Sequence, residues 1–306
     1  MSITYRPWAD GDDLALLQIL GDASHPALAE GRALLRPASE SPFVRTIVAE
    51  DDGVPVAAGV VSEASVHPER LWVYIEVARE RQREGIGSTL LAMLRQELGA
   101  APVQRLRGKV ELDSPGASFA ASAGFAPLQH SQVVVVHPKA LPLVPLHEDG
   151  SQVIEDLATG SVELTRALWD FYRAVHDWDP PADLSVGRVN QLFLGDASGA
   201  HGAVVLRENG AIRAFAISYA GTAPDDPTVA PPAERPADEP TDVLLGYDPS
   251  VHNPSFALGQ LLALLVATYP VAVEVDESMG DLTDLLAPLI AEGRAEVVQR
   301  TLIVAD

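Results

Sequence analysis

Residues 82–88, with the sequence Gln-Arg-Glu-Gly-Ile-Gly-Ser, form the pattern with the clearest chemical meaning in this chain. An apolar run from Leu71 to Val77 precedes them, and residues 89–95 after them have the apolar spacing of a helix. A strand, a turn with two glycines and a helix together present free backbone N–H groups at the positive end of the helix dipole. Phosphate groups bind at such positions, and glycine lets them approach the backbone closely. We therefore expect residues 82–88 to bind a phosphate or pyrophosphate.

Two familiar glycine motifs do not fit this turn. The dinucleotide-binding motif requires a third glycine three residues after Gly87, where the chain has Leu90. The Walker loop requires a lysine followed by serine or threonine, and the only lysines in the sequence are Lys109 and Lys139. The turn instead fits the pattern Gln/Arg-x-x-Gly-x-Gly/Ala, with Val77 at the end of the strand five residues before it. The alternative to a ligand-binding motif is that the turn needs small residues only for packing.

With Phe119 and the run 123–125 (Ala-Gly-Phe) downstream, this pattern resembles the acetyl-CoA signature of the GNAT (Gcn5-related) N-acetyltransferases. The resemblance implies an enzyme that moves an acetyl group from acetyl-CoA, without a metal, to an amine of a small molecule or peptide. A non-catalytic acyl-CoA-binding or scaffolding protein of the same fold is the alternative. The residues that the resemblance assigns to the cofactor are Val77, Ala78, Arg79, Gln82, Arg83, Glu84, Gly85, Ile86, Gly87, Ser88 and Thr89.

The residues available for catalysis differ from those that the family often uses. Relatives often place a Glu or His four or six residues before the strand-end valine, where this chain has Val73 and Leu71. The tyrosine that often protonates the leaving thiolate follows Phe119, where this chain has Ala120. The resemblance still implies that the backbone N–H of Val77 polarises the thioester carbonyl.

Glu76, Asp113 and Tyr74 are the candidates for acid–base catalysis. Because side chains alternate along a strand, Tyr74 and Glu76 share one face of their strand, opposite Val73 and Ile75. An ion pair with Arg79 or another nearby arginine is the alternative role for Glu76.

Composition excludes several classes of protein. The chain has 306 residues, 47% of them hydrophobic, so we expect two domains with buried cores. The formal net charge of −22 argues against nucleic acid as a partner and favours a cationic amine, with solubility as the alternative explanation. Cysteine is absent, the N-terminus does not resemble a signal peptide, and no apolar run reaches the ~20 residues of a membrane span. We therefore expect a cytoplasmic protein without membrane contact.

The predicted elements place this chemistry in the first of two similar α/β halves. Residues 3–137 have the order β-α-(α)-β-β-β-α-β-α-β, which is the order of a GNAT domain, and the second half repeats it. We therefore expect tandem GNAT-like acyl-CoA N-acyltransferase domains with mixed sheets, similar to mycothiol synthase and other actinobacterial acetyltransferases. The predicted boundaries are a GNAT domain that binds acetyl-CoA at 1–138, a linker at 139–160 and a degenerate GNAT-like domain at 161–306.

The second half departs from the first at residues 248–259, the counterpart of the glycine turn. Phe256 or Ala257 stands near the position of Gly85 and Leu258 near that of Gly87, and Pro254 removes one backbone donor. We therefore expect only the first domain to bind the cofactor. Residues 221–242 contain six prolines and six acids, which predicts a mobile surface loop whose charge attracts cations.

Overall fold

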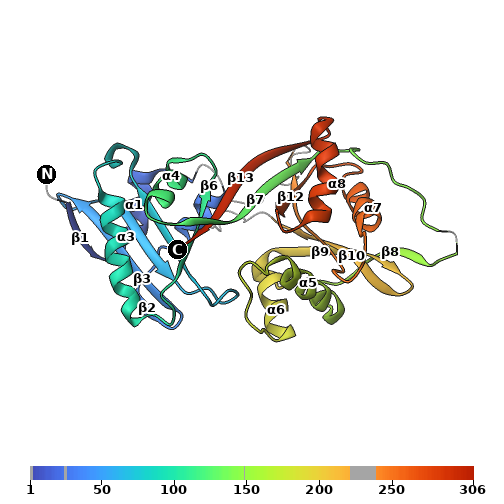
Figure 1. Cartoon of the computed structure of the whole chain (residues 1–306), viewed down its shortest axis with the longest axis horizontal. Helices are drawn as coiled ribbons and strands as arrows, with labels where there is room; N and C mark the ends of the chain where they lie inside the picture. Colours follow the sequence, from blue (N-terminus) through green and yellow to red (C-terminus); the bar gives the residue numbers. More distant parts are fainter. Residues whose placement is uncertain (1–2, 24–25, 148, 221–238) are drawn as a thin grey trace. The chain divides into compact units, whose positions relative to one another are not determined.

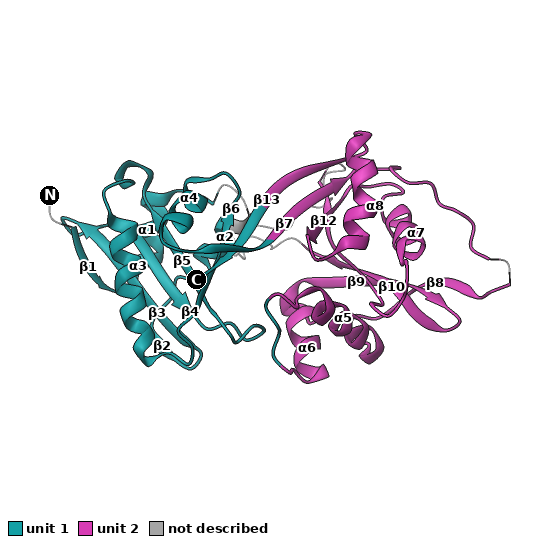
Figure 2. Ribbon diagram, in the orientation of Figure 1, with its two compact units in different colours: residues 1–129, 179–182, 301–306 teal, residues 130–178, 183–300 magenta. Residues whose placement is uncertain are grey.

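The computed structural model describes residues 3–23, 26–147, 149–220 and 239–306, which form an α/β protein (Figure 1). The chain divides into two compact units (Figure 2): unit 1 comprises residues 1–129, 179–182 and 301–306, and unit 2 comprises residues 130–178 and 183–300. The acidic segment predicted to be a mobile loop lies, as far as residue 238, outside the described residues. None of the helices in the described ranges is long and apolar enough to cross a membrane.

Unit 1 is built on a mixed sheet in the order β1-β3-β4-β5-β6-β13, with the short β2 beside β3. Neighbouring strands are antiparallel except β5 and β6, which run parallel. The bounds are β1 Ile3–Pro7, α1 Asp12–Leu20, α2 Pro26–Arg32, β2 Ser39–Glu40, β3 Phe43–Asp51, β4 Val54–Ser62, β5 Leu71–Val77, η1 Arg79–Arg81, α3 Ile86–Glu97, η2 Leu98–Ala100, β6 Leu106–Glu111 and α4 Pro115–Ser122.

Helices cover both faces of this sheet, and each face has its own apolar cluster. On one face, α3 contributes the buried Leu90 and Leu94 to the larger cluster. On the other face, Leu16 of α1 packs against Val48 and Ala58. The two clusters fix α3 and α1 on opposite sides of the central strands.

Unit 2 repeats this strand order as β8-β9-β10-β11-β12-β7, with β11 and β12 as its parallel pair. The bounds are β7 Ala126–Val136, β8 Gln152–Asp156, α5 Val162–Val175, α6 Val186–Phe193, η3 Asp196–Ser198, β9 Ala200–Glu208, β10 Ala211–Tyr219, β11 Thr241–Tyr247, α7 Ser255–Leu265, β12 Val271–Asp276, α8 Gly280–Ala291 and β13 Ala295–Ala305.

Each unit contains one strand from the other half of the sequence, and these strands, β13 and β7, are neighbours in the strand order. In unit 1, residues 301–305 of β13 pair antiparallel with residues 107–111 of β6. In unit 2, residues 131–136 of β7 pair antiparallel with residues 271–276 of β12. Leu302 and Val304 of β13 also join the larger apolar cluster of unit 1. The end of the chain therefore helps to build the core of unit 1.

Most elements predicted from the sequence are confirmed, and the strand predicted at 71–77 coincides with β5. The repeated order includes a first strand and a second helix in the second half, but no residue range is predicted for strand β8 or helix α6. Strand β8 falls inside the predicted linker and pairs with β9. Of its five residues only Gln152 is buried, so the sequence of β8 has no apolar alternation to reveal it. The predicted boundaries of the linker and the two domains stay predictions.

Candidate functional site

The sheet of unit 1 opens between β5 and β6. In the described part of unit 1, these parallel strands pair at Leu71 with Leu106 and at Trp72 with Arg107, and no further. Strand β5 nevertheless continues beside β4 as far as Val77. Val73 still lies beside Gly108 of β6, whereas residues 74–77 have a paired neighbour on one side and an opening in the sheet on the other.

Alternate backbone groups of β5 face this opening. The amide of Leu71 donates to the carbonyl of Arg105 on the β6 side at 2.9 Å, whereas the amide of Ala78 donates to the carbonyl of Val56 on the β4 side at 2.8 Å. Backbone groups alternate in direction along a strand, so odd-numbered residues of β5 face β6 and even-numbered ones face β4. The N–H of Val77 therefore faces the opening.

The glycine turn connects this strand end to α3. Gly85 is the N-cap residue, with a φ of 82° in the left-handed region that glycine adopts without a steric penalty. Arg83 in the same turn has a φ of 68°, which is uncommon for a residue with a side chain. Among the described residues no side chain caps α3. Its first amide groups are therefore available to an anion.

Side chains within the turn hold it in place. The Gln82 side-chain amide donates to the carbonyl of Val77 at 3.1 Å. Arg81 forms ion pairs with Asp51 at the end of β3 and with Glu84, the latter at 2.9 Å. These contacts attach the turn to the end of β5 and to the neighbouring hairpin without using the amide groups at the start of α3.

Gly87 lies in the first turn of α3, beside Phe119 and Val77. A Cβ added at this position would lie 3.7 Å from both side chains, which is an ordinary van der Waals distance. Packing within unit 1 therefore does not require glycine at position 87. This observation disfavours the alternative that the turn needs small residues for packing alone.

The residues predicted to bind the cofactor form one continuous segment of mixed exposure. Ala78 and Ile86 are buried, so their side chains are inaccessible to a ligand, and the amide of Ala78 is already bonded to Val56. Val77 and Gly87 are half-buried. The remaining members are exposed: Arg79, Gln82, Arg83, Glu84, Gly85, Ser88 and Thr89.

Tyr74 and Glu76 lie together on the face of β5 opposite the larger apolar cluster, as strand alternation predicts. The Tyr74 hydroxyl donates to Glu76 at 2.5 Å. Arg32 of α2 donates through Nε and Nη2 to the two carboxylate oxygens of Glu76, at 2.8 and 2.7 Å. Burial and the hydrogen bond to Glu76 raise the pKa of Tyr74, so its phenol keeps its proton at neutral pH.

The third catalytic candidate, Asp113, is exposed on the connection between β6 and α4 and has a φ of 60°. The structure therefore brings Tyr74 and Glu76 together and places Asp113 on a different connection. Sequence analysis identified neither Arg32 nor its role, because it lies 44 positions before Glu76 in a seven-residue helix. The alternative of an ion pair between Glu76 and a nearby arginine is confirmed, with Arg32 as the partner.

The corresponding turn of unit 2 connects β11 to α7. Pro254, which has no N–H, is the N-cap residue there. Counted from the start of the helix, Gly87 corresponds to Phe256, two residues before the predicted Leu258. Phe256 places a bulky side chain, 43% exposed, where unit 1 has a glycine. This turn therefore offers an anion less room and fewer donors than the turn of unit 1.

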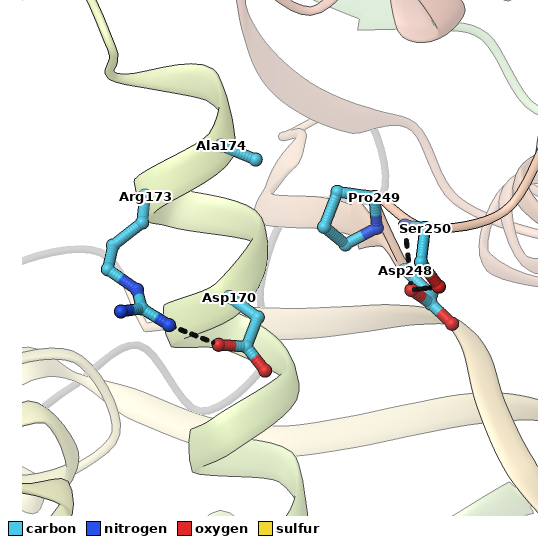
Figure 3. Close-up of a pocket in the computed structure, with 6 residues that line it drawn as sticks. All are labelled: Asp170, Arg173, Ala174, Asp248, Pro249 and Ser250. Atoms are coloured by element: carbon cyan, nitrogen blue, oxygen red, sulfur yellow. Dashed lines mark hydrogen bonds and ion pairs between the residues drawn. The ribbon is translucent and has the colours of Figure 1, made fainter.

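Unit 2 also has an open depression of about 540 Å³, lined by residues of α5 and of the segment after β11 (Figure 3). Arg173 donates to Asp170 at 2.6 Å, and Asp248 accepts from the amide of Ser250 at 2.9 Å and from Arg213 at 3.1 Å. The charged groups around the depression are therefore already paired. Within the described ranges, no group of three or more His, Asp or Glu residues is placed to hold a metal ion.

A protein-family model matches the part of unit 1 that contains this opening. Residues 14–125 match the model of the acetyltransferase (GNAT) family. The matched segment includes β5, the glycine turn, α3, β6 and α4. No curated protein is significantly similar to the chain in sequence.

Solved structures share the fold of the whole chain at low sequence identity. A tandem GNAT protein from the clavulanic acid biosynthesis pathway, solved without acetyl-CoA, is 16% identical with a TM-score of 0.64, and the alignment covers 100% of this chain and 98% of that one. A GCN5-related N-acetyltransferase from Sphaerobacter thermophilus is 15% identical with a TM-score of 0.63, and the alignment covers 99% and 95%. At these identities the likeness shows the fold alone, and that fold is the predicted tandem GNAT fold.

Proposed function

We propose, from the premise that residues 14–125 form a domain of the acetyltransferase (GNAT) family, that this chain moves an acetyl group from acetyl-CoA to an amine of a small molecule or peptide. One observation carries the proposal. Within the matched segment, β5 and β6 separate after Trp72 and Arg107, directly beside the N-terminus of α3, which no side chain of the described residues caps. This arrangement suits acyl-CoA in two ways. The amides of the helix N-terminus can bind its pyrophosphate, and a free donor at the strand end can bind its thioester carbonyl.

The residues of the turn fit the cofactor. The family uses acetyl-CoA, which supplies the acetyl group as an activated thioester. In our proposal the amides of residues 83–88 bind the pyrophosphate, whereas the amide of Thr89 already donates to the carbonyl of Gly85 at 3.0 Å. The exposed Arg79 and Arg83 add positive charge beside these amides. The N–H of Val77, which faces the opening, donates a hydrogen bond to the thioester carbonyl and stabilises the negative charge that develops on its oxygen.

The acceptor amine has to lose a proton to become a nucleophile. Of the three candidates, we propose Glu76 as the base that accepts this proton, either directly or through a water molecule. Glu76 is on the strand that borders the opening, and its carboxylate is fixed by Arg32 and Tyr74. Tyr74 serves as a hydrogen-bond donor to Glu76, because its raised pKa makes it a poor proton source for the thiolate. The exposed Asp113 is the second choice.

We further propose that the acceptor is cationic and that the reaction takes place in the cytoplasm. The net charge of −22 supports the first point, since an acidic protein attracts cations and steers them toward its sites. The absence of cysteine supports the second. Unit 2 binds no cofactor in this proposal, since Pro254 and Phe256 replace the features that suit a pyrophosphate in unit 1.

The test is a screen of primary amines with acetyl-CoA that follows release of the free thiol. The proposal expects at least one amine, most readily a polyamine, an aminoglycoside or a basic peptide, to accelerate thiol release above hydrolysis. Binding of CoA without turnover of any amine would instead support the acyl-CoA-binding alternative.

A further inference from the structure

The last three residues of α2 span the opening between β5 and β6. Glu30 pairs with Lys109 of β6 at 3.3 Å. Arg32 pairs with Glu76 of β5 through two hydrogen bonds, of 2.8 and 2.7 Å. Helix α2 therefore contacts both strands at positions beyond the pair where their own hydrogen bonding ends. It covers the opening on the face where Tyr74 and Glu76 lie.

Gly31 brings the backbone of α2 into close contact with β5. A Cβ at this position would lie 2.3 Å from the ring of Tyr74, far inside contact distance. Only glycine allows this approach, because any side chain would push α2 away from the strand. Helix α2 is thus held at this place by packing of Gly31 against Tyr74 and by the ion pair of Arg32 with Glu76.

Arg32 also attaches α2 to the end of α1. Its Nη1 donates to the carbonyl of Gly21 at 2.5 Å, and its Nη2 reaches the carbonyl of Leu20 at 3.4 Å. The side chains of Arg32 and Glu76 are each only 16% exposed. One guanidinium group therefore links the end of α1, the end of α2 and the strand that borders the opening.

We propose that Arg32 is a positioning residue for acetyl transfer, which acts by fixing α2 and the Glu76 carboxylate as the wall against which the acceptor amine is held. This role rests on the proposed function. An amine attacks a thioester efficiently only when it is held at a fixed place, and a displacement of about 1 Å costs about 100-fold in rate. Arg32 does not touch the cofactor turn, so its loss should affect the acceptor and leave CoA binding intact.

The experiment compares Arg32→Met and Arg32→Lys with Arg6→Met as a matched control. Arg6 also holds two carboxylates of unit 1, with hydrogen bonds of 2.7 Å to Asp12 and 2.8 Å to Glu50, but it lies on β1. For each variant, hydrogen exchange of residues 26–35, the Kd of CoA by calorimetry, and the kcat and KM of the best amine from the screen are measured. Hydrogen exchange reports the docking of α2 independently of any activity.

In Arg32→Met we expect exchange of residues 26–35 to accelerate at least tenfold, the Kd of CoA to stay within twofold, and kcat for the amine to fall by about 100-fold. Arg32→Lys should recover part of kcat, since lysine keeps the charge but cannot bind both carboxylate oxygens in a fork. Arg6→Met should leave kcat within twofold.

Full turnover in Arg32→Met, or an equal loss in Arg6→Met, would overturn the positioning role. A wild-type chain that neither binds CoA nor releases thiol would overturn the proposed function itself, whatever the exchange of α2.

Discussion

The guanidinium of Arg107 lies 4.2 Å from the centre of the Trp72 indole ring, at the last pair of residues that joins β5 to β6. Arg107 is buried and forms an ion pair with Asp179, which is itself fully buried. The same carboxylate accepts a hydrogen bond of 2.6 Å from Arg70. The inner end of the opening is therefore a buried charge cluster, and its acid Asp179 comes from the segment 179–182 of unit 1.

Substitution Asp179→Ala should lower the free energy of unfolding by about 3–5 kcal/mol, because it removes a buried acid that forms ion pairs with Arg70 and Arg107. Urea unfolding measures this change. The control is Glu69→Ala, which removes an exposed ion pair of 3.1 Å with Arg105 and should cost less than about 1 kcal/mol. Equal effects of the two substitutions would mean that Asp179 does not balance the buried arginine.

Substitution Leu302→Ala should destabilise unit 1, although residue 302 is near the end of the sequence. Leu302 is 8% exposed and belongs to the larger apolar cluster, so a cost of about 2–5 kcal/mol is expected. Val298→Ala, on the same strand but with a side chain that is 54% exposed, should change stability by less than about 0.5 kcal/mol. Hydrogen exchange of β6 compares the two variants and should accelerate in Leu302→Ala but not in Val298→Ala. Unchanged exchange of β6 in Leu302→Ala would contradict the packing of Leu302 in the core of unit 1.

Local signals made β5, the glycine turn and α3 predictable. Each depends on residues that are near one another in sequence, such as the apolar run 71–77 and the glycine at 85. The contact between Arg32 and Glu76 could not be predicted in this way, since the residues are 44 positions apart and many arginines could pair with the acid. The same limit applies to β13, whose apolar sequence predicts a strand but does not specify which sheet it joins.

Stability of unit 1 should fall in acid partly because of Asp12. Burial raises the pKa of Asp12, but the hydrogen bonds from Arg6 and the Ala9 amide lower it by more, so its pKa in the folded state is below the usual value near 3.8. A depressed pKa stabilises the fold above the unfolded pKa, and this contribution is lost as the pH falls through the folded pKa. Urea unfolding between pH 7 and about pH 3 should therefore show a smaller acid-induced loss in Asp12→Asn than in wild type. Parallel curves for the two proteins would contradict this assignment.

The kcat/KM of a cationic acceptor should fall as ionic strength rises. Salt screens the attraction between the acidic protein, with its net charge of −22, and a positively charged substrate. Steady-state kinetics at increasing NaCl concentration measure the slope, and a neutral amine of similar size is the control. Deleting the acidic residues 221–238 should weaken the slope. A preference for anionic amines, or no dependence on salt, would contradict the proposal of a cationic acceptor.

Calorimetry of CoA binding tests the central claim most directly, with Gly87→Ala, Gly87→Val and Gly187→Val as variants. Gly87 and Gly187 are each the second residue of a helix, and a Cβ at position 187 would meet no atom within 4 Å. The wild-type chain should bind one CoA per chain. Gly87→Ala should bind nearly as well, since the family pattern accepts alanine there, whereas Gly87→Val should lose at least about tenfold in affinity, or 1.4 kcal/mol. Gly187→Val should bind like wild type. No binding by wild type, two CoA molecules per chain, or unchanged affinity in Gly87→Val would contradict the assignment of this turn as the single acyl-CoA site.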